Sequence, residues 1–465
     1  MSRWPLIAAS AATALLLLDV TVVYLAAPAI GAGLDASFTE LQWVIDAYAL
    51  AMAAVLLPAG ALADRRGRRR TFLIGLALFA AGSAWCAAAT SAPMLDVARA
   101  LQGIGGACLF ATSLGLIGGA YEGRALASAL GVWGAVSGVA LAAGPVVGGI
   151  VVDGLDWRWI FWLNLPACLL LGLLALRRVP ESRDPSAPPP DVVGSVLAAG
   201  SLLLLVGTLL QGNERGWTSP EIVAALVAAA ALLAAFVAHQ RRARYPLIEP
   251  GLWRRREFSV TALVTLLQSV AIYPVLLFLA LELQGVYGFD ALEAGLRVLP
   301  VTAALLVVAP LAGRLTHRLP LWSLLAAGLL ITALGLLVTA SVELADGWSA
   351  LLPGFVVLGV GIGILSPALA AAIVGMLPAA QAGLASGIGN TFRQAGIALG
   401  VALFGVVFRL ATPDDPGLAL VLVGGEAGSD RVALEFFDGV RSVLLVAAGI
   451  AFAGALAALA LRSRR

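Results

Sequence analysis

Fourteen long apolar runs divide this chain, and they constrain its fold more than any other feature. The runs lie near 5–28, 41–63, 71–91, 94–119, 125–152, 159–178, 191–211, 220–239, 258–284, 292–313, 320–341, 349–374, 383–410 and 440–461. Each has about the 20 residues that an α-helix needs to cross the hydrocarbon core of a membrane. The strands of a membrane barrel alternate apolar and polar residues in short segments, so these continuous runs exclude a barrel. The sequence therefore predicts an all-α integral membrane protein with fourteen transmembrane helices.

The arginines between the runs predict which helix ends face the cytoplasm. Twenty-one arginines flank one set of ends and five flank the other. Loops that stay inside carry an excess of Lys and Arg, and an even number of spans puts both termini on one side. We therefore expect both termini in the cytoplasm and a location in the plasma membrane. Three arginines remain within spans, namely Arg99, Arg297 and Arg393.

The connections between the runs predict three parts of the chain. The tract 180–190 is rich in proline, which blocks a helix and favours extended chain, and 240–257 is rich in arginine. The parts are an amino-terminal six-helix bundle, a linker with two extra helices and a cytoplasmic loop, and a carboxyl-terminal six-helix bundle, at 1–178, 179–257 and 258–465. The longest outer connection, 411–439, is acidic, and we expect it to be solvated and mobile.

The segment 60–72 holds five arginines and an aspartate between the second and third runs. Its pattern, Gly-x-Leu-Ala-Asp-Arg-x-Gly-Arg-Arg, resembles the loop signature of the major facilitator superfamily of transporters. The resemblance implies two six-helix halves that rock about a central cavity, and it implies that the turn acts as a conformational latch. The alternative is a purely topological marker. The latch candidates are Gly60, Asp64, Arg65, Gly67, Arg68 and Arg69.

Ionisable residues inside the apolar runs are candidates for proton coupling. Asp19 lies roughly 13 Å from the outer end of its span, and Asp46 and Arg99 lie about 8 Å from theirs, at 1.5 Å per residue. Charged groups are expensive in the membrane, so they are functional candidates by default. We expect Asp19, with Arg99 and Asp46, to couple proton flow to transport. The alternative is a static ion pair that locks the amino-terminal bundle.

Two glycine-rich motifs carry a further resemblance. The stretch around Arg99 and Gln102 resembles the span-four motif of the superfamily, in which the arginine is tied to proton transfer. Gly-Pro-x-x-Gly-Gly in span five resembles the antiporter motif of the same superfamily, although Ala140 replaces an expected glycine. Ordinary tight helix packing explains such small residues equally well. The antiporter-motif residues are Gly144, Pro145, Gly148 and Gly149.

The start of span six has the sequence Trp157-Arg-Trp-Ile-Phe-Trp-Leu-Asn164-Leu-Pro166. This sequence, the Asp19 motif and the number of spans resemble the fourteen-span drug–proton antiporter family. An aromatic belt at the membrane interface explains the tryptophans without function. Tyr24 stands where that family often has Asn, so the substrate range here is expected to differ.

Polar residues in the carboxyl-terminal half are candidates for a substrate cavity. Arg393 lies about 15 Å deep in span thirteen, near the midplane, and Gln268 in span nine lies at a similar depth. Such residues line a cavity or hydrogen-bond across helices as structural glue. The cavity candidates are Tyr24, Gln268, Asn390, Arg393 and Gln394.

Glu282 near the outer end of span nine is a candidate second acidic site. Arg297 lies near the same end, and Glu293 precedes it by four residues on one helix. The alternative to a proton site is therefore a local ion pair.

The function that these features predict is proton-coupled export of amphipathic or lipophilic small molecules, such as drugs, by alternating access. No Gly-x4-Gly-Lys-Ser/Thr loop for ATP appears, and a proton gains about 2.3 kcal/mol per 100 mV of membrane potential. The alternatives are export of an endogenous lipid or secondary metabolite, and a membrane sensor that does not transport. We expect a monomer in the lipid bilayer that needs no cofactor, no metal and no nucleic acid, and that is not an enzyme.

Overall fold

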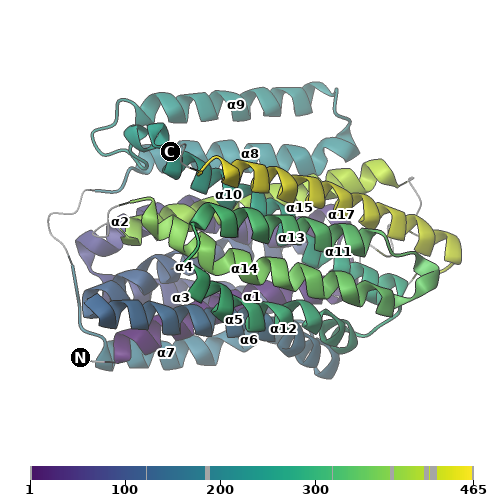
Figure 1. The fold of residues 1–465 in the computed structure, drawn as a ribbon, viewed down its shortest axis with the longest axis horizontal. Helices are drawn as coiled ribbons and strands as arrows, with labels where there is room; N and C mark the ends of the chain where they lie inside the picture. The colour runs from purple at the N-terminus through teal and green to yellow at the C-terminus, as the bar shows by residue number, and fades with distance from the viewer. Residues whose placement is uncertain are drawn as a thin grey trace.

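The computed structural model describes residues 3–121, 123–183, 189–316, 318–377, 382–412, 418, 421 and 427–462. Fourteen helices in this part of the chain are long and apolar enough to cross a membrane, as predicted. They run side by side along the bundle, and the two marked chain ends lie at the same end of it (Figure 1). The predicted all-α membrane fold is confirmed. Asp414, Asp415, Glu426, His317, Arg464 and Arg465 lie outside the described residues.

The first six spans belong to seven helices, because the sixth span is interrupted at Leu163. These helices are α1 (Trp4–Leu34), α2 (Phe38–Arg66), α3 (Arg68–Ala87), α4 (Ala92–Ala120), α5 (Gly123–Gly154), α6 (Trp159–Trp162) and α7 (Asn164–Arg178). Helix α2 begins in a capping box, in which the Ser37 hydroxyl accepts from the Glu40 amide and the Glu40 carboxylate accepts from the Ser37 amide. Such a box satisfies two amides that the helix leaves unpaired.

The remaining eight spans follow the proline-rich tract. The helices are α8 (Val192–Arg215), α9 (Pro220–Gln240), η1 (Pro250–Arg254), α10 (Arg256–Ile272), α11 (Val275–Leu281), the π-helix η2 (Glu282–Val286), α12 (Ala291–Leu315), α13 (Leu321–Ala340), η3 (Leu344–Asp346), η4 (Trp348–Leu351), α14 (Leu352–Gly375), α15 (Ala382–Ala411) and α17 (Asp430–Leu459). Span nine comprises α10, α11 and η2. Pro274 stands at its first break, where proline removes a backbone donor.

The last span begins earlier than the apolar run indicates. Helix α17 starts at Asp430, whereas the sequence predicts a solvated connection up to residue 439. Its first three turns bury Val432, Phe436 and Phe437. Glu435 lies between these apolar positions and Asp438 follows them, so the two charges mask the helical spacing of the apolar residues. The expectation of a mobile loop is therefore wrong for 430–439.

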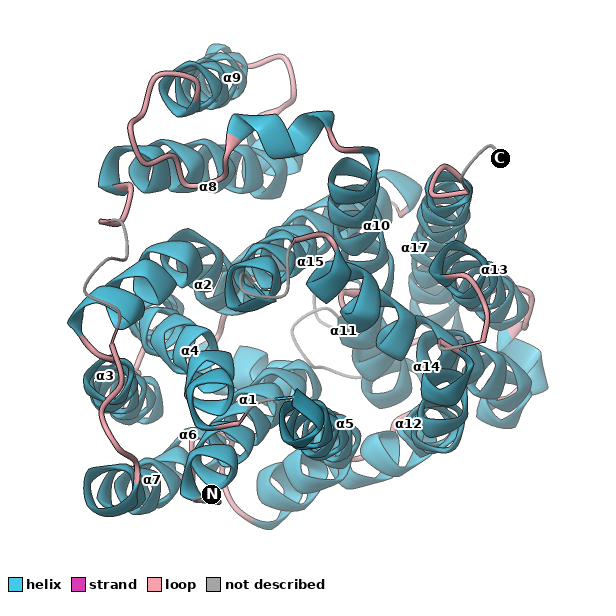
Figure 2. Ribbon diagram, turned by 60° about the vertical axis from the view of Figure 1, so that its left-hand side comes forward, coloured by secondary structure: helices cyan, strands magenta, loops and turns pink. Residues whose placement is uncertain are grey.

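The helices before the proline-rich tract pack mainly on one another, as do those from α10 onward. The two groups meet along a seam formed by α2 with α15, α5 with α12, and α1 with α11. Helix α8 packs against both α2 and α15, and α9 lies beyond α8 (Figures 1 and 2). The division at 178 and 258 stays a prediction.

The helix bundle has two opposite end faces, the turn face and the far face. The turn face carries Arg65–Arg70 and both chain ends, and the far face carries the start of α2 and the end of α5. On the far face, a Cβ added at Gly149 of α5 would collide with the backbone of Leu292 in α12. Toward the turn face, a Cβ added at Gly131 or Gly134 of α5 would meet nothing within 4 Å. Helices α5 and α12 are therefore tightly packed at Gly149, near the far face.

Candidate transport site

A buried ion pair joins α1 to α4. The Arg99 Nη1 donates to Asp19 Oδ2 at 2.7 Å, and the two side chains are 2% and 1% exposed. Asp19 Oδ1 accepts two more hydrogen bonds, from Gln102 Nε2 at 2.9 Å and Asn164 Nδ2 at 2.7 Å. Ser83 accepts from the same two amides. The network therefore holds α1, α3, α4 and α7 together inside the amino-terminal half.

Arg99 also holds α2. Its Nε donates to the Val44 carbonyl at 3.1 Å, and its guanidinium lies 4.3 Å from the centre of the Tyr48 ring. Cations are attracted to the face of an aromatic ring, most strongly away from water. The sequence brings Asp19 and Arg99 together correctly. In the sequence, Gln102 and Asn164 stand out only as parts of motifs, and no pattern indicates Ser83.

Asp46 lies apart from this network, although its position in α2 is between Val44 and Tyr48. It is 0% exposed, and neither carboxylate oxygen has a hydrogen-bond partner among the described residues. The Tyr24 hydroxyl is also unpartnered within that part of the chain, and Tyr24 interacts electrostatically with Asp46 and Tyr273. The grouping of Asp19, Arg99 and Asp46 thus separates into a bonded pair and an unpaired acid.

Asp46 faces the seam. One turn before it in α2, the Gln42 amide donates to the Val401 carbonyl of α15 at 2.7 Å. Residues four apart share one face of a helix. Tyr24 of α1 interacts electrostatically with Asp46 and also with Tyr273, which follows α10 in the other half.

The arginine turn is bonded within the amino-terminal half. Arg68 pairs with Asp64 at 2.9 Å, and its Nη1 donates to the Gly115 carbonyl near the end of α4 at 3.0 Å. Arg69 Nη1 donates to the Val179 carbonyl at 3.2 Å. Asp64 therefore accepts from an arginine of its own turn, as one form of the latch hypothesis requires.

Glu181 completes the turn, and the sequence did not single it out. Its carboxylate accepts from the amides of Arg69 at 2.9 Å and Arg70 at 3.1 Å, at the start of α3. These amides have no partner within the helix, and a negative charge suits a helix amino terminus. Gly67 has φ 124°, and an added Cβ would lie 2.7 Å from the Glu181 carboxyl carbon. Glycine alone fits here.

The antiporter-motif residues place α5 between two partners. A Cβ at Gly144 would collide with Thr21 of α1, and one at Gly148 would lie 3.2 Å from Val22. A Cβ at Gly295 of α12 would collide with the Pro145 carbonyl. Close packing thus extends from the amino-terminal half across the seam, as small residues permit in lipid.

Asp153 at the end of α5 crosses the seam and was not predicted. Its carboxylate accepts hydrogen bonds from the amides of Ala291, at 3.1 Å, and Leu292. The Asp290 carboxylate accepts from the next amide, Glu293, at 2.6 Å. Helix α12 therefore has its first amides satisfied partly by the opposite half. The only sequence signal was an acid at the end of an apolar run.

The cavity candidates of the carboxyl-terminal half mostly bond locally. Gln268 Nε2 donates to Ser269 Oγ at 2.7 Å, and Asn390 Nδ2 donates to the Ser386 carbonyl at 2.9 Å. Gln394 reaches Met52 of α2 across the seam. Arg393 Nε is buried and has no hydrogen-bond partner in the part of the chain that the structure describes. These bonds of Gln268 and Asn390 stay within their own helices, so the cavity role and the cross-helix role of both side chains stay predictions.

The predicted local ion pair near the far end of α12 forms. Arg297 Nη1 lies 3.8 Å from Glu293 Oε2 and donates to the Glu293 carbonyl at 3.0 Å. The Arg297 guanidinium lies 3.5 Å from the centre of the Phe289 ring. Glu282 takes no part in this pair. It lies in η2 and lines a separate small cavity with Arg441.

In the part of the chain that the structure describes, fourteen helices are long and apolar enough to cross a membrane, which is the pattern of a multi-pass membrane protein. A model of the Major Facilitator Superfamily matches residues 9–401, and the chain belongs to that family. It is therefore a transporter and not an enzyme.

Relatives of this chain include drug-resistance proteins. The puromycin resistance protein pur8 of Streptomyces alboniger is 35% identical over 96% of this chain and 90% of its own length. The multidrug efflux pump LfrA of Mycolicibacterium smegmatis is 32% identical over 98% and 92%. The tetracenomycin C resistance and export protein of Streptomyces glaucescens is 34% identical over 88% and 77%. The chain is thus related to drug and antibiotic efflux pumps.

Solved structures of the same fold include a bacterial homologue of the lysosomal transporter Spinster. Its inward-facing structure has a TM-score of 0.67, with 18% identity, over 100% of this chain and 99% of that chain. An auto-inhibited POT family peptide transporter gives a TM-score of 0.66, with 17% identity, over 100% and 97%. At these identities the likeness concerns the fold alone.

Proposed function

We propose that the chain exports amphipathic small molecules across the plasma membrane in exchange for protons. The observation that carries the proposal is Asp46, a fully buried carboxyl group whose oxygens have no partner among the described residues. A carboxylate charge buried without donors costs several kcal/mol, so gaining or losing one proton changes the energy of the seam by that order. The relatives named for multidrug efflux and for export support drug-like compounds as cargo.

The turn face is then the cytoplasmic face, and substrate enters from it. Contacts near the far face, at Gly149 with Leu292 and at Asp153 with Ala291, hold the two halves together there. Export requires these contacts to open and the turn face to close. A proton that enters from the outer side supplies about 2.3 kcal/mol per 100 mV toward this cycle.

Asp19 and Arg99 act in this proposal as positioning residues for Asp46. Arg99 bonds the Val44 carbonyl and lies over the Tyr48 ring, so it fixes α2 on both sides of Asp46. The Asp19 carboxylate already accepts from Arg99, Gln102 and Asn164, and the bond from the charged Arg99 is of the strong, charge-assisted kind. Proton exchange at Asp19 would require this network to open.

Efflux from inverted membrane vesicles tests the proposal. We expect a panel of lipophilic dyes to be accumulated only while a proton gradient exists, and Asp46→Asn to abolish accumulation because the amide cannot exchange the proton. Asp35→Asn is the matched control, since Asp35 is an exposed helix-end residue at φ 51°, a conformation that Asn tolerates.

Three outcomes would overturn the proposal. Accumulation that survives an uncoupler would exclude proton coupling, and binding of the dyes without movement would indicate a sensor. Gradient-driven accumulation by Asp46→Asn at the level of Asp35→Asn would exclude Asp46 as the exchanging group.

A further inference from the structure

A second buried carboxyl group lies in the opposite half of the molecule, at a break in span nine. Glu282 is 1% exposed and is the first residue of the π-helix η2. The Tyr287 amide donates to the Glu282 carbonyl at 3.2 Å, which is the five-residue spacing of a π-helix. Single π-turns within α-helices often mark functional sites.

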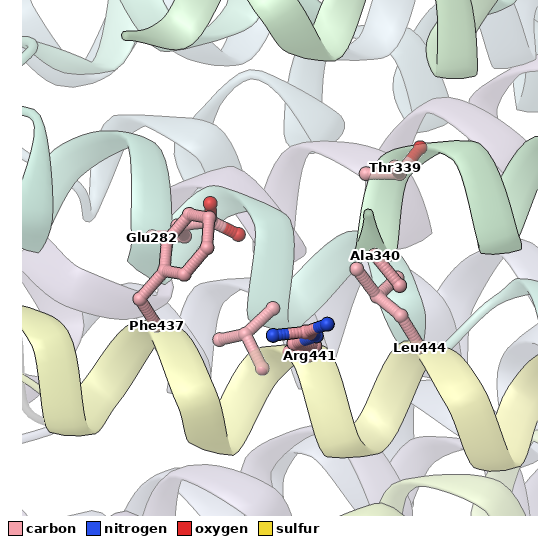
Figure 3. A pocket seen from close by; sticks show the side chains of 7 residues that line it. Glu282, Thr339, Ala340, Phe437, Arg441 and Leu444 are labelled. Atoms are coloured by element: carbon pink, nitrogen blue, oxygen red, sulfur yellow. The ribbon is translucent and has the colours of Figure 1, made fainter. Parts of the chain in front are cut away.

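Glu282 lines a small cavity near the far face (Figure 3). The cavity has a volume of about 10 Å³, which is the size that holds one water molecule. Four residues of α17 and two of α13 form the rest of the wall, and they are Phe437, Val440, Arg441, Leu444, Thr339 and Ala340. The α17 residues follow the spacing of one helix face, so α17 lies along the cavity.

Arg441 connects this cavity to the surface, because it lines the cavity and is itself exposed. Among the described residues, no ion pair joins Arg441 to Glu282. Thr339 Oγ1 donates to the Gly335 carbonyl, so its oxygen remains available to accept from a water. Glu282 is therefore buried among apolar side chains, with one cation and one hydroxyl at the edge of its cavity.

Few other charges face Glu282. Tyr287 interacts electrostatically with both Glu282 and Asp346. On α12, Glu293 and Arg297 pair with each other. Helices α11 and α13 contain no charged residue. On α17, Glu435 pairs with Arg431, and Asp438 is the remaining acid near Arg441. Arg441 is thus the cation that lines the Glu282 cavity.

We propose that Glu282 is a second proton-binding site, reached from the outer face through this cavity. A hydronium ion in the cavity transfers a proton to a Glu282 carboxylate oxygen: one O–H bond of the hydronium breaks, one O–H bond forms on the carboxyl group, and the remaining water leaves past Arg441. This proposal rests on the proposed function, which supplies the proton gradient and makes the far face the outer face. Together with Asp46 it gives two proton-binding carboxyl groups, one in each half.

The site is connected to the seam through η2. Two residues after Glu282, the Gln284 amide donates to the Leu25 carbonyl of α1 at 3.1 Å. Leu25 is the neighbour of Tyr24, which interacts electrostatically with Asp46. Protonation of Glu282 removes a charge from the first residue of η2. Gln284 of the same short helix is bonded to α1 in the opposite half. A proton bound at Glu282 is therefore expected to change the contact between η2 and α1 as well as the charge of the carboxyl group.

Labelling with a lipophilic carbodiimide tests proton binding directly, because this reagent modifies protonated carboxyl groups in apolar surroundings. The full-length purified protein is labelled across a pH series, and the modified peptides are quantified by mass spectrometry. We expect modification at Glu282 that falls about tenfold per pH unit above its midpoint. Arg441→Gln should increase labelling at a fixed pH, since loss of the cation disfavours the carboxylate.

Asp19 is the internal control, because its carboxylate is paired with Arg99 and should stay unmodified. Absence of labelling at Glu282, or labelling that does not change with pH, would overturn the proposal. Labelling of Asp19 to the same extent would also overturn it, since the reaction would then report accessibility and not protonation.

A transport measurement separates this site from the proposed function. Glu282→Gln should lower the number of protons moved per substrate while substrate exchange without a gradient continues. Glu293→Gln is the control, because Glu293 is an exposed acid at the same face. An unchanged proton-to-substrate ratio in Glu282→Gln overturns the second site. Wild-type efflux that is unchanged by an uncoupler instead overturns the proposed function. In that case the labelling result alone decides whether Glu282 binds a proton.

Discussion

The buried pair of Asp19 and Arg99 is satisfied at nearly every polar atom. Asp19 accepts from three side chains, and Arg99 donates to Asp19, Gln102 and the Val44 carbonyl. Two charges taken out of water are tolerable only when both are paired and hydrogen-bonded. At the scale of single residues, the amino-terminal half is therefore sensitive to loss of either member.

Arg99→Gln should destabilise the protein more than removal of both charges. The single change leaves Asp19 as an uncompensated buried charge, which costs about 3–5 kcal/mol. Asp19→Asn combined with Arg99→Gln removes that charge and should recover part of the loss. Thermal unfolding of the purified protein in detergent measures the difference. A double variant that is no more stable than Arg99→Gln would contradict this account of the pair.

Gly67→Ala should loosen the arginine turn. Its φ of 124° strains any side chain, and the new Cβ would press on the Glu181 carboxylate that caps α3. We expect a loss of about 1–3 kcal/mol from this local strain. Gly118→Ala is the control, because its Cβ would meet nothing within 4 Å. Limited proteolysis at 179–183 measures the loosening, and equal cleavage of both variants would exclude it.

The sequence predicted which residues are charged and roughly how deep they lie, but not which of them bond. Depth follows from counting along a helix, so Asp19 and Arg99 were placed at the same end of the bundle. Asp19 also bonds Asn164 of α7, which in turn donates to Ser83 of α3. The rotation of each helix about its axis that brings these side chains together is set by tertiary packing. Asp46 and Arg99 were grouped on depth alone, and they point to different neighbours. Glu181 and Asp153 escaped notice because each bonds amides of a distant helix.

At the scale of elements, one carboxylate joins the two extra helices. Asp191 caps α8 through the Gly194 amide at 2.8 Å, and it also bonds Gln240 at 2.7 Å and the Leu247 amide at 3.2 Å. His239 Nε2 of α9 lies 2.9 Å from it. Burial opposes its charge, but these hydrogen bonds outweigh burial and lower the pKa of Asp191 below its ordinary value. We call this contact the hairpin clamp.

The hairpin clamp should be insensitive to pH until strongly acidic conditions. Because the pKa of Asp191 is lowered in the folded state, its stabilisation is fully present above the unfolded value of about 3.9 and is lost as pH falls through the folded value. Asp191→Asn should weaken the clamp at neutral pH by about 1–2 kcal/mol. Faster hydrogen exchange at 239–248 would report this, whereas unchanged exchange would show that packing alone holds α9.

At the scale of the whole molecule, the apolar runs predicted the number of spans but not their neighbours. Lipid tails are as apolar as the side chains between helices, so hydrophobicity does not distinguish a seam from a lipid-facing surface. The small residues of α5 did indicate close packing, and they lie against α1 and α12. The pairing of α2 with α15, and the position of α8 over both, had no signal in the sequence.

Asp153→Ala should shift the molecule toward a state that is open at the far face. The carboxylate accepts from the first amides of α12 across the seam, and hydrogen bonds to a charged group contribute about 1.5–3 kcal/mol. Losing them changes the ratio of closed to open states by about tenfold or more. Leu292→Cys reports that ratio through its rate of reaction with a hydrophilic thiol reagent, because Cys86, Cys108 and Cys168 are buried. Asp156→Ala is the control, since Asp156 bonds its near neighbour Arg158. If both variants react at the wild-type rate, Asp153 does not hold the far face closed.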